Sequence, residues 1–215
     1  MAPPFGGAIQ TVQAYTIGYN FDISLIPIDY FRPLQSSSPS GLWTLSQPAV
    51  FGSEPLVMTP SKNYTAKDWK SLISDLGLDL LTTNHDRIQN PRLDQLVHPL
   101  VETDVFFGSQ IQTPSALVFD QDLHPNQKLA PASKSFEEGD GTVPVRSALW
   151  AKKWKRTDNS SEEVVFHEIP GAGHVSMLTQ VPALQQVVNL IAASNSLPLV
   201  DLYKIEAAIR IRSLK

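Results

Sequence analysis

A chain of 215 residues is long enough to bury a sizeable core, and its 42% hydrophobic and 18% charged residues are typical of a globular protein rather than a disordered one. The formal net charge of −4 argues against nucleic acid as a partner, because phosphate binding needs a basic surface. There are no cysteines, which excludes disulfides, a thiol nucleophile and cysteine-ligated metals. No apolar run approaches the roughly 18 residues that a membrane-spanning helix needs.

The first half of the chain shows few patterns of regular structure. Residues 1–20 are small and apolar, and residues 23–59 are rich in proline, serine and aromatic side chains, as in a long functional loop. The clearest helix follows: Thr65 and Asp68 form a box-like cap, and Gly77 is placed to end it. Apolar residues of this helix recur at helical spacing: Trp69, Leu72, Ile73 and Leu76.

The second half alternates between strand and helix patterns. Strands are predicted at residues 115–119 and, most clearly, at residues 163–169. Helices are predicted at residues 146–154 and 180–194, and a polar segment occupies residues 120–141. The apolar residues expected to face inward from the last helix are Val181, Leu184, Val187, Val188 and Ile191. This alternation predicts a parallel sheet covered by helices, with function in the loops after the carboxyl ends of its strands.

Two of these loops each hold one reactive side chain among turn-forming residues. Asp140 lies between two glycines in "EEGDGTVPVRS", and His174 follows "PGAG" in "PGAGHVSML". Their separation is about one strand–helix–strand repeat, so the two loops can be neighbours at one edge of a sheet. A carboxylate that accepts from one imidazole nitrogen leaves the other nitrogen as a base. Each residue alone is also explained by its turn, but together they predict a catalytic pair.

The other histidines are weaker candidates. His85, His98 and His124 follow no predicted strand, and His167 lies inside the strand at residues 163–169, where a structural role is expected. No histidines and carboxylates have the spacing of metal ligands. We therefore expect neither a metal nor another cofactor.

The order of the two residues predicts a fold as well as a chemistry. In the α/β-hydrolase fold the chain order is nucleophile, acid and histidine, and Asp140 followed by His174 fits the last two members. The nucleophile should stand in a Gly-x-Ser-x-Gly elbow, and no serine in this sequence has glycines at both of those positions. The sequence therefore predicts a partial α/β-hydrolase fold that carries two members of a triad.

Several segments make the sequence similar to the lecithin:cholesterol acyltransferase family, nearest its lysosomal phospholipase A2 branch. They are "APPFGGAIQTV", "LVMTPSKNYTAKDWKSLISDLG", "GDGTVPVRSAL" and "PGAGHVSML". The most specific are the Gly-Asp-Gly-Thr-Val motif and the later His-x-x-Met-Leu motif. The resemblance covers about residues 2–190 and adds an expected activity to the expected fold.

The resemblance implies lipid acyl transfer or hydrolysis through a Ser-Asp-His triad, with Asp140 as acid and His174 as base. The implied partners are phospholipid or another acyl lipid, a lipid alcohol as acyl acceptor, and a membrane or lipoprotein surface approached peripherally. A secreted, lysosomal, vacuolar or endomembrane compartment is also implied, although residues 1–10 lack the pattern of a signal peptide. The residues expected to contact lipid chains from a cap are Phe31, Leu42, Trp43 and Leu45.

The resemblance also divides the chain into four expected parts. Residues 1–16 would end a core strand and begin a loop, and residues 17–60 would form the cap. Residues 61–195 would be the C-terminal part of an α/β-hydrolase domain, and residues 196–215 a helix or tail. Members of the family carry the serine and the oxyanion loop ahead of the segment at which this sequence starts. The chain is therefore expected to be a fragment of an active enzyme, the partner of a separate N-terminal half, or a non-catalytic lipid-binding remnant.

Overall fold

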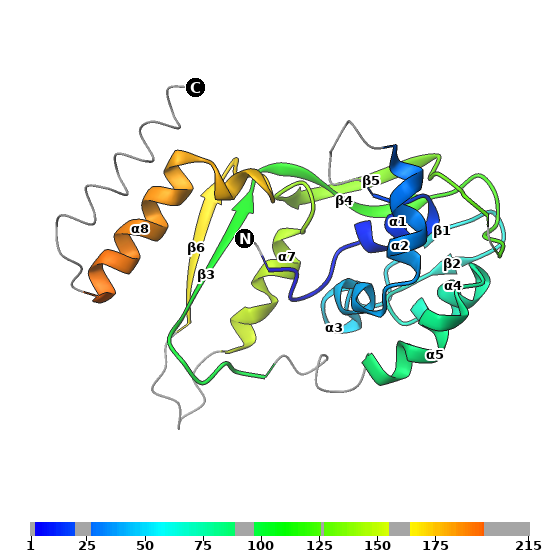
Figure 1. The fold of residues 1–215 in the computed structure, drawn as a ribbon, viewed down its shortest axis with the longest axis horizontal. Coiled ribbons are helices and arrows are strands. Elements are labelled where there is room, and N and C mark those ends of the chain that lie inside the picture. The colour runs from blue at the N-terminus through cyan, green and yellow to red at the C-terminus, as the bar shows by residue number, and fades with distance from the viewer. Residues whose placement is uncertain (1–2, 20–26, 89–96, 126, 155–163, 196–215) are drawn as a thin grey trace.

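The computed structural model shows a mixed α/β protein with two sheets and surrounding helices (Figure 1). Most helices of the N-terminal half gather at one end of the molecule, and two parallel strands stand at the other end. The structure describes residues 3–19, 27–88, 97–125, 127–154 and 164–195. The predicted helix or tail at residues 196–215 lies outside the described residues.

The larger sheet has four strands in the order β2–β1–β4–β5. Its strands are β1 (Val57–Met58), β2 (Asn63–Tyr64), β4 (Ile111–Val118) and β5 (Ser133–Gly139). β1 pairs antiparallel with β2 and parallel with β4, and β4 pairs antiparallel with β5. The sequence did not predict β5, because most of its side chains are polar and exposed, as expected for the last strand of a sheet.

Short helices replace the long loop expected in the first 60 residues. They are α1 (Gln10–Thr16), η1 (Ile28–Tyr30), α2 (Phe31–Ser36), η2 (Pro39–Thr44) and α3 (Pro48–Phe51). No strand occurs among residues 3–9, and α1 stands where a loop was predicted. This helix forms because Ile9, Val12 and Tyr15 share one face and are almost completely buried in the core.

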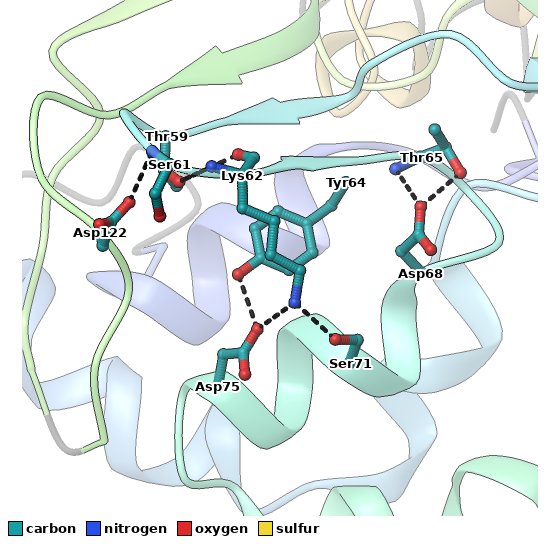
Figure 2. A network of polar contacts seen from close by, with 9 residues as sticks. All are labelled: Thr59, Ser61, Lys62, Tyr64, Thr65, Asp68, Ser71, Asp75 and Asp122. Atoms are coloured by element: carbon teal, nitrogen blue, oxygen red, sulfur yellow. Dashed lines mark hydrogen bonds and ion pairs between the residues drawn. The ribbon is translucent and has the colours of Figure 1, made fainter.

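The predicted helix after Thr65 is α4 (Trp69–Asp75), and α5 (Asp79–Ile88) follows it. The backbone N–H and the hydroxyl of Thr65 donate to the Asp68 carboxylate at 2.8 and 2.7 Å (Figure 2), and these bonds lower the pKa of Asp68. The helix ends at Gly77, whose φ is +69°, and the N–H of Leu78 donates to the Ile73 carbonyl as in a Schellman cap. The predicted end at Gly77 is confirmed, whereas the start lies later than predicted: Asp68 rather than Thr65 is the N-cap residue, and the Thr65–Asp68 bonds close the turn that precedes the helix.

The smaller sheet consists of β3 (Thr103–Ser109) and β6 (Val164–Pro170), which are parallel over their full length. Helical segments predicted at residues 146–154 and 180–194 are present as α7 (Val145–Ala148) with η3 (Leu149–Trp154), and as α8 (Val181–Asn195). Ala148 and Ala183 from these helices pack in one cluster with Phe107 and Ile169 of the sheet.

One prediction about this sheet was wrong. The neighbour of β6 is β3, whereas residues 115–119 contribute to β4 of the other sheet. A buried strand pattern indicates burial but not the identity of the partner strand, so sequence alone could not assign the pairing. Of the residues predicted to face inward from α8, Val181, Leu184, Val187 and Val188 are half-buried. Within the described residues, no helix is long and apolar enough to cross a membrane.

Two glycines with left-handed backbones provide a test of how α4 is anchored. A methyl group at Gly77 would lie 2.7 Å from Pro125 Cβ, whereas one at Gly52, whose φ is +60°, would meet nothing within 4 Å. Gly52→Ala is expected to lose about 1–3 kcal/mol of unfolding free energy through backbone strain alone, because its φ of +60° with ψ of −128° is sparsely populated by residues other than glycine. Gly77→Ala should lose a further ~1–3 kcal/mol through the clash. Urea unfolding measures both losses, and equal losses would contradict the packing described for Gly77.

Candidate active site

The Asp140 carboxylate is held by its own loop through one oxygen. Oδ1 accepts the N–H groups of Thr142 and Val143 at 2.9 and 2.6 Å, which closes a tight turn. Gly141 within this turn has a φ of +89°, and its N–H donates to Thr113 Oγ1 of β4. Asp140 is 2% exposed, so its carboxylate is removed from water and fixed by backbone donors.

The other carboxylate oxygen faces the predicted histidine. Oδ2 of Asp140 lies 2.8 Å from Nδ1 of His174, and the backbone N–H of His174 donates to the Asp140 carbonyl, also at 2.8 Å. The side chain of His174 is 23% exposed, while that of Asp140 is 0% exposed. A buried carboxylate beside Nδ1 favours a proton on that nitrogen and leaves Nε2 as the base.

The carboxyl end of β3 brings the two loops together. A methyl group added at Gly108 would lie 2.0 Å from the Ala172 carbonyl oxygen and 2.8 Å from Cβ of Asp140. The backbone of β3 therefore touches both loops at once, which no larger residue would permit. β6 runs parallel to β3 and leads directly into the loop of Ala172 and His174.

His174 lines a cavity of about 280 Å³. α1 contributes one wall and the segment from α2 to η2 contributes another, while Thr142 and Val143 bring the acid loop to the same space. The remaining lining residues are Pro4, Ala8, Gln10, Thr11, Ala14, Tyr15, Tyr19, Gln35, Ser38, Ser40, Gly41 and Thr44. The histidine thus meets a cavity that is large enough for a short aliphatic ligand.

The predicted lipid-contact residues lie elsewhere, and two of them require correction. Leu42 and Leu45 are completely buried in the hydrophobic core with Val12, so they are not available to a ligand. Trp43 is 55% exposed and Phe31 is half-buried, and neither lines the cavity. Residues 17–60 do line the cavity, but mostly through smaller and more polar side chains. The aromatic content of this region could not predict which of its residues face the cavity.

A second histidine–carboxylate pair occurs on the sheet. His167 Nε2 lies 2.7 Å from Asp104 Oδ1, and the imidazole stacks on Phe106 with ring centroids 4.6 Å apart. These residues come from the adjacent strands β3 and β6, and none of them lines the cavity. This pair links two strands, which agrees with the structural role expected for His167.

A serine close to the site is already engaged. Ser109, at the end of β3, is 0% exposed and donates its hydroxyl to the carboxylate of Glu168 rather than to His174. No pattern in the sequence indicates this bond, or the cavity residues Gln10 and Tyr15 of α1, because each depends on contacts between distant segments. Among the described residues, no cluster of three or more ligating side chains could hold a metal ion.

Comparison with known proteins places these residues in a family context. The lecithin:cholesterol acyltransferase family model matches residues 79–181, which include both loops. The human lysosomal phospholipase A and acyltransferase is 26% identical over 188 residues, or 86% of this chain and 43% of that protein. Lecithin-cholesterol acyltransferase-like 1 of Arabidopsis thaliana is 28% identical over 200 residues, or 91% of this chain and 43% of that protein.

The mouse phosphatidylcholine-sterol acyltransferase is 23% identical over 192 residues, or 87% of this chain and 42% of that protein. The chain therefore spans less than half the length of these curated relatives. The motifs around Asp140 and His174, the family model and the relatives all agree. The family resemblance predicted from the sequence is confirmed, because this chain is similar to lecithin:cholesterol acyltransferases and to lysosomal phospholipases A.

Proposed function

We propose that this chain supplies the acid and the base of a lipid acyltransferase or phospholipase A. The observation that carries the proposal is the 2.8 Å contact between Asp140 Oδ2 and His174 Nδ1, with the carboxylate buried and the imidazole at a cavity. A histidine–carboxylate contact alone does not indicate catalysis, because His167 and Asp104 also form one between two strands. The pair at His174 differs in that its imidazole lines the cavity and both of its residues lie in the family motifs.

The chemistry would require a serine that this chain does not supply in an elbow motif. His174 Nε2 would take the proton of that serine hydroxyl while the oxygen attacks a lipid ester carbon. The imidazolium, stabilised by Asp140, would then protonate the departing alcohol to leave an acyl-enzyme. Water would release the acyl group as a fatty acid, or a lipid alcohol would receive it as a new ester. Backbone amides would stabilise the oxyanion at each step.

We further propose that the fold is part of an α/β-hydrolase fold. The parallel strands β3 and β6 support this, because the acid and the histidine lie at their carboxyl ends. On this proposal residues 61–195 belong to the hydrolase domain, and residues 17–60 act as a cap because they supply part of the cavity lining. Trp43 and Phe31 remain candidates for contact with a lipid surface at the outside of this cap.

His174→Ala tests the proposed base. Joined to the part of the human relative that the match does not cover, the chain is expected to release fatty acid from phosphatidylcholine vesicles. His174→Ala should lower kcat/KM by at least about 1,000-fold, because the serine loses its base. Fatty acid release is measured directly at matched protein concentration.

His167→Ala is the matched control for this variant. The two imidazoles are similarly exposed, at 22% and 23%, and each contacts an aspartate. The control is expected to keep kcat/KM within about threefold, since His167 does not line the cavity. Equal losses in both variants would show that His174 acts through stability, and an active His174→Ala variant would reject the triad.

Asp140→Asn tests the pair in the 215-residue chain itself. The amide oxygen can still accept the N–H groups of Thr142 and Val143, so the turn is retained while the charge beside His174 is lost. The wild-type Nδ1–H should give a proton resonance far downfield that Asp140→Asn abolishes. Asp104→Asn should leave this resonance unchanged. A His174 signal that is insensitive to Asp140→Asn would contradict the contact.

A further inference from the structure

Arg146, on α7, makes three contacts with other elements of the fold. Its Nη2 donates to the carboxylate of Glu137 at 2.8 Å and also to the carboxylate of Glu54. Its Cζ lies 4.1 Å from the centroid of the Phe51 ring. A single ion pair on a protein surface contributes little, but the three charged side chains here are only 25–41% exposed and form one network over an aromatic ring.

The ion pair with Glu137 closes the loop that holds Asp140. Glu137 lies on β5 shortly before Asp140, and Arg146 lies on α7 shortly after it. Within this span the backbone is paired as well, since Gly139 and Pro144 form a bridge. The ion pair therefore adds a side-chain tie between the strand that enters the acid loop and the helix that leaves it.

The contacts with Phe51 and Glu54 anchor this loop to the main core. Phe51 of α3 is 3% exposed and belongs to the core cluster that also contains residues of α1 and α4. Ser147, the next residue of α7, makes a second attachment, because its buried hydroxyl accepts the N–H of Gly6 at 3.0 Å. Gly6 lies just before α1, which lines the cavity. α7 is thus attached to the core and to the segment that leads into a wall of the cavity.

α7 also packs against the loop of the histidine. Val143 of the acid loop and Ala148 of α7 belong to one buried cluster with Ala172 and Met177, which lie on either side of the histidine in the sequence. A displacement of α7 would reach both loops through this cluster, because closely packed side chains transmit such shifts. The contacts that hold α7 in place therefore also help to hold the carboxylate against the imidazole.

We propose that Arg146 is a positioning residue for the pair of Asp140 and His174. It holds α7 between β5 and the core, and this keeps the carboxylate aligned with the imidazole. Its ion pairs go to Glu54 and Glu137 rather than to either member of the pair, and it does not line the cavity. The inference rests on the proposed function in taking this pair as the catalytic acid and base.

Arg146→Met tests the inference in the 215-residue chain. Methionine keeps much of the apolar length of the side chain but removes the charge and both ion pairs. The downfield Nδ1–H resonance of His174 should persist, because Asp140 is retained. Its exchange with water should become at least about fivefold faster, because the acid loop opens more often. The exchange rate is measured from the line width and by saturation transfer at matched pH and temperature.

Arg146→Lys is the conservative variant. Both ion pairs of Arg146 are made by the same nitrogen, Nη2, so one ammonium group with three donors can serve both carboxylates. Arg146→Lys should therefore keep the exchange rate of the His174 Nδ1–H within about twofold of the wild type. Exchange as fast as in Arg146→Met would contradict a role for the ion pairs.

Lys62→Met is the matched control. Lys62 also pairs with a carboxylate, that of Asp75 at 2.7 Å, and its Nζ lies 4.4 Å from the centroid of the Tyr64 ring (Figure 2). These partners lie on α4 and β2 rather than beside the acid loop. Lys62→Met and Arg146→Met should each lower Tm by at most about 4 °C, whereas Lys62→Met should leave the exchange rate unchanged. Equal acceleration of exchange in both variants would assign the effect to lost stability and overturn the inference.

The joined enzyme provides a catalytic test. Arg146→Met should lower kcat and kcat/KM by a similar factor, about 5- to 50-fold, because a misaligned acid and base weaken the transition state and not substrate binding. Lys62→Met should leave both parameters unchanged. A rise in KM with unchanged kcat in Arg146→Met would reject a role in aligning the pair.

An unchanged exchange rate in Arg146→Met would also overturn the inference. Its outcome is separable from that of the proposed function, because exchange in this chain needs no serine. Faster exchange in Arg146→Met, with fatty acid release that does not depend on His174, would retain the positioning role and reject the triad. Release that depends on His174, with an exchange rate indifferent to Arg146, would do the reverse.

Discussion

The arrangement of the site depends on a close backbone approach at Gly108. The end of β3 touches both the loop of Asp140 and the carbonyl of Ala172, with no room for a Cβ atom. The two loops are also joined directly, since the His174 N–H donates to the Asp140 carbonyl. The side-chain contact between carboxylate and imidazole is therefore built on main-chain contacts, which fix it more firmly than two flexible side chains could.

The position of Asp140 also depends on pairing between distant strands. After β3 ends at Ser109, the chain forms the hairpin of β4 and β5. Asp140 follows directly after β5 and forms a bridge with Ile111, the first residue of β4. The same hairpin joins β1 at the end of the molecule where most helices of the N-terminal half gather (Figure 1). Just beyond the acid loop, Arg146 forms ion pairs with Glu54 and Glu137. The acid loop and the N-terminal helices that wall the cavity are thus held by one connected set of contacts.

Local signals in the sequence were sufficient for some of these features. The C-terminal end of α4 follows from Gly77, and the Thr65–Asp68 contact forms as predicted but in the turn before the helix, because these preferences act within a few residues. The pairing of β3 with β6 could not be obtained in this way, because a hydrophobic strand pattern does not specify its neighbour. Likewise, the apolar character of Leu42 predicted lipid contact, when the same property drives it into the core.

For the site, the sequence predicted the contact between the aspartate and the histidine but not the surroundings that distinguish this pair. Glycines around Asp140 and His174 indicated tight loops, and the two loops do meet. The same chain holds a second pair, His167 with Asp104, at a similar distance. That pair lies between adjacent strands, with its aspartate one-third exposed and outside the lining of the cavity. The chemical difference between the pairs lies in burial of the carboxylate and access of the imidazole to a cavity, and both arise from tertiary packing.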